Sequence, residues 1–281
     1  MKRLLFIFSI FSMCFLAPLS KVTAASDTVR PIKILLVPGH DDEVWGAQYG
    51  NIKEADMNLA LASKIHDILK KDKRFKVYIS RDKKGYTKEF SDYFSKNKED
   101  ILVFRENAKA YTKSKVASGE FTVKTSPPHN NATEDVAIRL YGFNKWADEK
   151  EMDAVIHIHF NDYPRPDKWT IGKYEGFTVY FPDAELPNGE KSEDLAADIF
   201  EQLDKKYTGS NFPPEKGGLV ADQSLIALGS NSTLLPSVRS VLVEYGYIYE
   251  KKFRKKSARE LAYKKMASLT AAGVEQYFFP K

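Results

Sequence analysis

Apolar residues in this chain occur either in short continuous runs or at helical spacing. Residues 32–37 form an apolar run that stops at Pro38-Gly39, which is typical of a buried strand before a turn. Apolar positions over 54–71 have helical spacing, and residues 75–80 alternate like a strand. A strand, a helix and a strand in this order indicate a right-handed βαβ unit and a largely parallel sheet.

The same patterns return in the second half of the chain. They predict strands at 153–160, 176–181 and 240–245, and helices at 134–150, 191–205 and about 257–277. No internal repeat or low-complexity linker divides the chain. We therefore expect an α/β protein with a single layered domain over residues 29–281, in which helices flank a mostly parallel, twisted central sheet.

Residues 81–133 are charged and aromatic but only weakly patterned. Within them, residues 101–115 have helical spacing, and residues 122–131, which include Pro127-Pro128, are predicted to be loop. We interpret the whole stretch as an insertion or lid and assign it no chemistry.

The first residues have the pattern of an export signal. Lys2 and Arg3 precede an apolar run over 4–19, and Val22-Thr23-Ala24 has the small residues that a signal peptidase accepts. The run is shorter than the roughly 20 residues that span a bilayer as a helix. A cleaved signal peptide over residues 1–24 is therefore favoured over an uncleaved anchor. We predict a secreted, periplasmic or cell-wall-associated protein without stable membrane insertion after cleavage.

Charge and cysteine content narrow the possible functions. The formal net charge is +5, and cleavage would remove Lys2, Arg3 and Lys21, leaving about +2. That charge does not argue for nucleic acid as a partner. Cys14 is the only cysteine and lies inside the predicted signal, which excludes a disulfide framework in the mature chain. Stability must come from a core, for which roughly 255 residues suffice.

Candidate chemistry lies where polar side chains follow the predicted strands. His40, His159 and Glu244 each stand at or just after the end of a strand, and Glu54 begins the first helix. Ligands of open α/β sheets bind at the carboxyl ends of the strands. Two imidazoles and one carboxylate are a normal ligand set for catalytic zinc, and a further carboxylate can transfer a proton. The four residues together therefore indicate metal-assisted amide hydrolysis.

Taken singly, these residues are not specific. A histidine after a strand is more often a surface or hydrogen-bonded polar group than a ligand. Glu54 alone would be a favourable first-turn residue, because a carboxylate there interacts well with the helix dipole. Glu244 is harder to explain structurally, since a carboxylate at the end of an apolar strand is costly to bury without a partner.

Four segments, in order, resemble the zinc-dependent N-acetylmuramoyl-L-alanine amidases of the amidase 3 type. They are Val37-Pro38-Gly39-His40 with Glu54 and Asn58-Leu59, residues 136–144 with Arg139, Ile158-His159-Phe160-Asn161 followed by residues 174–181, and residues 241–248 around Glu244. The resemblance covers nearly the whole mature chain except residues 81–133.

The resemblance implies both a site and a substrate. It implies zinc (Zn²⁺) held by His40, Glu54 and His159, with Glu244 as the catalytic carboxylate. The bond cut would join N-acetylmuramic acid to the L-alanine of the stem peptide, so the partner would be cell-wall peptidoglycan. The substrate is implied by the resemblance alone.

The sequence also departs from the family pattern. Asp41-Asp42-Glu43 stand where the family has Gly-Gly, and they could support the ligands, add a ligand or form a solvated loop, which is favoured. His157 would share a face with His159 and could orient a ligand, compete for metal or, as we favour, pack with a satisfied hydrogen bond. His66 and His129 are interpreted as structural or surface groups.

Two other functions stay open on these grounds. A zinc peptidase or amidohydrolase could use the same residues on a different amide, and the acidic loop and the insertion leave room for it. A wall-binding module could have kept the fold and lost catalysis, although the presence of all four chemical residues argues against this. The basic residues at 251–256 are interpreted as a solvated helix start rather than a wall-polymer contact.

Overall fold

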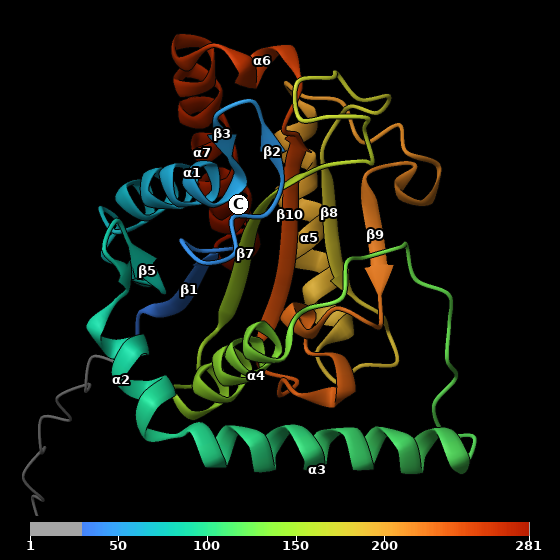
Figure 1. The fold of residues 1–281 in the computed structure, drawn as a ribbon. Coiled ribbons are helices and arrows are strands. Elements are labelled where there is room, and N and C mark those ends of the chain that lie inside the picture. Colours follow the sequence, from blue (N-terminus) through green and yellow to red (C-terminus); the bar gives the residue numbers. More distant parts are fainter. Residues whose placement is uncertain (1–29, 281) are drawn as a thin grey trace, which may run out of the picture. The chain divides into compact units, whose positions relative to one another are not determined.

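A six-stranded sheet lies at the centre of the computed structural model, which describes residues 30–280 (Figure 1). Its strands run in the order β4 (Phe75–Ile79), β1 (Ile32–Pro38), β7 (Ala154–Asn161), β10 (Arg239–Tyr247), β8 (Thr178–Pro182) and β9 (Leu219–Asp222). The first four are parallel, β8 is antiparallel to β10, and β9 is parallel to β8. The predicted α/β class with a mostly parallel sheet is confirmed.

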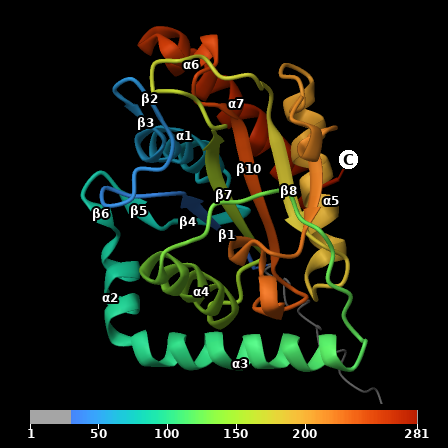
Figure 2. The same cartoon turned by 45° about the vertical axis from the view of Figure 1, so that its right-hand side comes forward.

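Helices cover both faces of this sheet, as Figures 1 and 2 show. One face packs against α1 (Glu54–Leu69), α5 (Gly189–Asp204) and α7 (Lys256–Phe278), and the other against α4 (Glu134–Glu149). Both faces of the sheet are apolar, as strand β1 illustrates: Ile34 packs in the core on the α1 side and Leu35 in the core on the α4 side. The four helices that were predicted outside residues 81–133 are all present, and their ends lie within two residues of the predicted ends.

The shorter elements lie around this frame. They are β2 (Gln48–Tyr49), β3 (Ile52–Lys53), β5 (Arg81–Asp82), β6 (Gly85–Tyr86), α2 (Lys88–Lys96), α3 (Lys98–Ala117), α6 (Lys251–Arg254) and the 3-10 helices η1 (Pro213–Glu215), η2 (Ile226–Leu228) and η3 (Ser230–Ser232). Among residues 30–280, no helix combines the length and apolarity needed to cross a membrane. The predicted signal at residues 1–24 lies outside the described part of the chain.

Residues 81–133 are more regular than their pattern suggested. The predicted helix at 101–115 lies within α3, and the predicted loop at 122–131 is free of helix and strand. Helix α2 was not expected, and its one buried residue, Phe90, packs on Trp146 of α4. We call residues 119–133, between α3 and α4, the strap. It runs past β9 and β8 before it enters α4 (Figures 1 and 2).

Candidate metal centre

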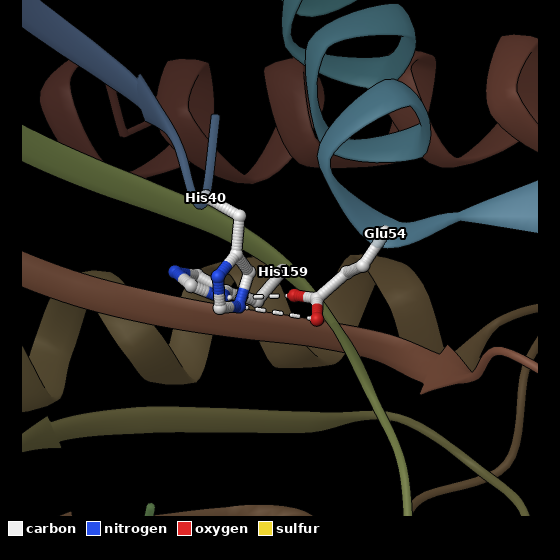
Figure 3. Close-up of side chains that lie close together, drawn as sticks. All are labelled: His40, Glu54 and His159. Atoms are coloured by element: carbon white, nitrogen blue, oxygen red, sulfur yellow. Dashed lines mark hydrogen bonds and ion pairs between the residues drawn. The ribbon is translucent and has the colours of Figure 1, made fainter. Parts of the chain in front are cut away.

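The three ligands expected from the sequence converge at the carboxyl ends of β1 and β7. Their potential ligand atoms all lie within 4.8 Å of one another. His159 Nδ1 is 3.0 Å from Glu54 Oε1, and His40 Nε2 is 3.1 Å from Glu54 Oε2. Figure 3 shows the carboxylate facing both imidazole rings. This spacing suits two nitrogen donors and one oxygen donor around a single ion.

A buried arginine and an asparagine hold the turn that carries His40. His40 has a φ of 57°, a left-handed conformation that is uncommon for residues other than glycine. The buried Arg81 donates to the carbonyls of Pro38, Gly39 and Ala55. Asn58 Nδ2 also donates to the Gly39 carbonyl. These hydrogen bonds stabilise the unusual backbone that aims the His40 ring at Glu54.

The protonation of Glu54 and His159 suits metal binding, whereas protons would compete with a metal for His40. Burial alone would raise the pKa of Glu54, but hydrogen bonds from His159 and His40 outweigh it and lower this pKa far below its usual range. Burial lowers the pKa of His159, which favours its neutral form. Burial opposes protonation of His40 too, yet the hydrogen bond to Glu54 raises the pKa of His40. Carboxylates and neutral imidazoles are the metal-binding forms.

Two glycines allow the backbone to approach the ligands closely. A Cβ atom at Gly39 would overlap with the His159 ring, and one at Gly46 would overlap with both Glu54 Oε2 and the His40 ring. Gly46 also has a φ of +69°, which disfavours other residues. The backbone N–H of the next residue, Ala47, donates to Glu54 Oε2 at 2.8 Å. The Gly46 segment therefore supports two ligands at once.

We expect Gly46→Ala to weaken metal binding at this candidate centre by about 10- to 100-fold, the range found when groups that orient metal ligands are changed. The new methyl group would displace Glu54 and His40. Gly85→Ala is the matched control, because Gly85 also has a positive φ but open space around its Cβ position. Competition against a zinc chelator measures both affinities. Equal affinities for the two variants would contradict the supporting role of Gly46.

Glu244 lies beside the three ligands. It pairs with His159 across β10 and β7, and its Oε2 is buried without a hydrogen-bond partner among the described residues. Burial, followed by the negative charges of Glu54 and Glu215, raises the pKa of Glu244 well above its ordinary value. A cation bound by the neighbouring ligands would offset this repulsion, so the surroundings of Glu244 fit a metal site.

An open groove of about 980 Å³ contains all four residues. Its other lining comes from Gly46 to Gln48, from the loop after β7, from Tyr180 and Leu242 on the sheet, and from Pro128 to Asn130 of the strap. The strap therefore forms part of the same depression as Glu244. Sequence reasoning interpreted residues 81–133 as an insertion or lid but assigned no chemistry to any residue of the strap.

A buried carboxylate in the same groove was also missed. Glu215, at the end of η1, accepts hydrogen bonds from Asn161, Thr178, Tyr180, Ser210 and Tyr247 at 2.7–3.1 Å. These donors come from separate parts of the chain, so they satisfy a charge that would otherwise be costly to bury. In the sequence, Glu215 follows Pro213-Pro214 and has the pattern of a surface turn.

The acidic loop after His40 is partly buried. Asp41 is buried, and its Oδ1 accepts from the backbone N–H groups of Glu43 and Val44. Its Oδ2 accepts from Tyr86 and lies 3.5 Å from Arg139. The favoured interpretation as a solvated loop is therefore wrong for Asp41, which orders the loop, whereas Asp42 and Glu43 are exposed.

The remaining histidines have different surroundings. His157 is fully buried, and burial, with the nearby His159, lowers its pKa to about 3. It makes a hydrogen bond to the backbone of Ala227, although its Nε2 has no partner among the described residues. His66 is a partly exposed residue on α1, as expected. His129 is an exposed residue that bonds to Asp222, in agreement with its interpretation as a structural or surface group, and it also lines the groove.

A mostly parallel sheet has two imidazoles and a carboxylate near its strand ends, beside a second carboxylate whose Oε2 has no hydrogen-bond partner among the described residues. This is the construction of a metal-dependent hydrolase. The chain belongs to the N-acetylmuramoyl-L-alanine amidase family, which it matches over residues 34–276. The family and the amidase activity predicted from the sequence are thus confirmed. Comparison with curated proteins finds no match.

Solved amidase structures share this fold. The CwlD amidase of Clostridioides difficile, solved in complex with the GerS lipoprotein, has a TM-score of 0.55 at 18% identity, covering 88% of this chain and 98% of that one. The amidase Ami1 of Mycobacterium abscessus has a TM-score of 0.57 at 16% identity, covering 89% and 100%. The catalytic domain of CwlV from Bacillus (Paenibacillus) polymyxa has a TM-score of 0.55 at 16% identity, covering 89% and 99%. At such identities the similarity supports the fold.

Proposed function

We propose that this chain is an exported, zinc-dependent N-acetylmuramoyl-L-alanine amidase that hydrolyses cell-wall peptidoglycan. The observation that carries the proposal is the convergence of His40, Glu54 and His159 within 4.8 Å beside the unpaired carboxylate of Glu244. Family membership supports the substrate, since the family is defined by the bond between the muramoyl group and L-alanine. The export pattern in the first residues supports the location outside the cytoplasm.

His40, Glu54 and His159 would hold the zinc. Two nitrogen donors and one carboxylate are a ligand set typical of catalytic zinc sites. Bound there, zinc supplies polarisation of the substrate carbonyl and lowers the pKa of a water molecule to about 7. Asn58 Nδ2 and the Ala47 N–H donate to Glu54 and keep its carboxylate facing the two rings.

Glu244 would move the proton during hydrolysis. Glu244 pairs with His159 across the neighbouring strands, and both residues line the groove. From there Glu244 accepts a proton from the attacking water and returns that proton to the amide nitrogen as the C–N bond breaks. Burial and the negative charges of Glu54 and Glu215 raise the pKa of Glu244, which helps this carboxylate to hold the transferred proton until it returns it to the amide nitrogen.

Purified peptidoglycan provides the direct test of this function. We expect one zinc per chain and release of stem peptides that begin with a new L-alanine amino terminus. Chelation should stop this release and added zinc should restore it, because hydrolysis depends on the ion that the three ligands hold. Zinc-dependent cleavage of other bonds alone would contradict the substrate, and chelator-resistant cleavage would contradict the role of the metal.

A further inference from the structure

The strap is tied firmly to the edge of the sheet. Thr122 N–H donates to Glu185, and the side chain of Gln223 exchanges two hydrogen bonds with the backbone of Thr122 and Lys124. Lys124 Nζ adds an ion pair of 2.7 Å with Asp183. The hydrogen bonds from the strap backbone and the ion pair of Lys124 together hold the strap beside the ends of β8 and β9.

His129 continues this attachment at the groove. Its Nε2 lies 2.9 Å from Asp222 Oδ2, and its ring meets the Tyr180 ring edge-on at 5.4 Å. Asp222 is fully buried, and its other oxygen accepts from Ser224 and from the Leu225 N–H. The His129 ring is therefore held by a buried carboxylate and an aromatic neighbour, while it still lines the groove. Because the His129 ring is already held in place, it loses less conformational entropy when a ligand binds.

The register of the sheet places this end of the groove relative to Glu244. Glu244 pairs with Thr178, and Leu242 pairs with Tyr180, the residue that His129 touches. Tyr180 thus lies two residues along the strands from the Glu244 pair, which is roughly 7 Å at about 3.3 Å per residue. An extended peptide covers a similar distance with two residues. The position of Tyr180, whose ring His129 contacts, is therefore about two peptide residues away from the Glu244 pair along the strands.

The groove lining that comes from β2 and from the loop after β7 differs from the part that the strap contributes. It includes Gln48 and Lys168, whereas the strap contributes an imidazole held by a buried carboxylate. Such a fixed polar group suits the amides and carboxylates of a peptide.

We propose that the strap forms a subsite for the stem peptide, and that His129 is a specificity-determining residue that hydrogen-bonds the stem beyond its first residue. The inference rests on the proposed amidase function. Because Asp222 engages Nε2, Nδ1 is the ring nitrogen left for the ligand. Nδ1 accepts from a peptide N–H in the neutral ring and donates to a carboxylate or carbonyl in the protonated ring. Asp222 is a positioning residue that acts through His129.

Soluble muramoyl peptides with one-residue and three-residue stems test this subsite. For His129→Ala, we expect KM on the three-residue stem to rise about three- to tenfold, the effect of one hydrogen bond, with kcat unchanged. Neither constant should change on the one-residue stem. His129→Gln should raise KM in the same way, because its amide can still donate to Asp222 but has no atom at the position of Nδ1. Val123→Ala, on a strap residue that is 70% exposed, is the matched control.

The alternative outcomes separate this inference from the proposed function. An equal change on both stems, a fall in kcat on both, or wild-type kinetics for His129→Gln would overturn the subsite, because each would mean that His129 only anchors the strap. Thermal unfolding of each variant tests whether the fold is retained. Wild-type protein that cleaves neither muramoyl peptides nor purified wall would instead contradict the amidase function itself.

Discussion

Glu244→Gln is expected to retain one zinc per chain while hydrolysis of peptidoglycan falls by about 10²- to 10⁴-fold, the usual contribution of a general base. The amide cannot accept the proton of the attacking water, but it leaves His40, Glu54 and His159 in place. Metal analysis and the rate of stem-peptide release measure the two effects on one sample. Glu43→Gln is the matched control, because Glu43 is an exposed acid of the neighbouring loop that does not line the groove. An active Glu244→Gln protein would contradict the assignment of Glu244 as the general base.

The same variant should also change stability in chelated protein. Burial and the charges of Glu54 and Glu215 raise the pKa of Glu244 in the folded state. When the pKa of a carboxyl is higher in the folded than in the unfolded state, the group stabilises the fold fully only at a pH below its pKa in the unfolded state. This stabilisation is lost as the pH rises through its pKa in the folded state. Gln cannot ionise. Chelated Glu244→Gln should therefore unfold at a higher temperature than chelated wild type at pH 8, and this advantage should shrink toward pH 4.

His159→Ala is expected to abolish both zinc retention and hydrolysis. Removal of a ligand leaves only His40 and Glu54, so the loss of affinity should exceed the 10- to 100-fold that accompanies changes in residues supporting a ligand. Hydrolysis should fall to background, because the polarised carbonyl and the activated water are lost together. Zinc content after gel filtration and the rate of stem-peptide release are the measurements.

His66→Ala is the control for this loss, since His66 is a partly exposed histidine of α1 away from the groove. It should retain zinc and activity. Zinc retention by His159→Ala at wild-type affinity would show that the metal is held elsewhere.

Zinc binding by the wild type should also weaken as the pH falls, because protons compete for His40, whose pKa is raised, and then for Glu54.

The sequence predicted the central elements well because their patterns report burial directly. Strand β1 is a continuous apolar run since both of its faces are covered, and α1 has helical apolar spacing since only one side meets the sheet. Strand β9 was missed because its four residues at the edge of the sheet are too few to show a periodic pattern. Strand β8 begins at Thr178 rather than at residue 176, because Gly176 adopts a φ of 101° before it.

The residues of the site also divide into those that the sequence revealed and those that it did not. His40, His159 and Glu244 could be found because each lies at or after the end of an apolar strand, and parallel strands bring their carboxyl ends to one edge. Glu215 and His129 could not be found this way. Glu215 lies at the end of a short 3-10 helix and His129 on the strap, and neither position has a periodic pattern that reports its partners.

The sequence by itself therefore determined the α/β class, the order of most elements and the four residues proposed for catalysis, because these depend on local periodicity and on the polar residues at the strand ends. The tertiary structure alone decided the antiparallel direction of β8, the burial of Asp41 and the contacts of Glu215. It also decided the placement of the strap against Tyr180 and Asp222. These features arise from packing between segments far apart in the chain, and such packing leaves no spacing in the sequence that could predict it.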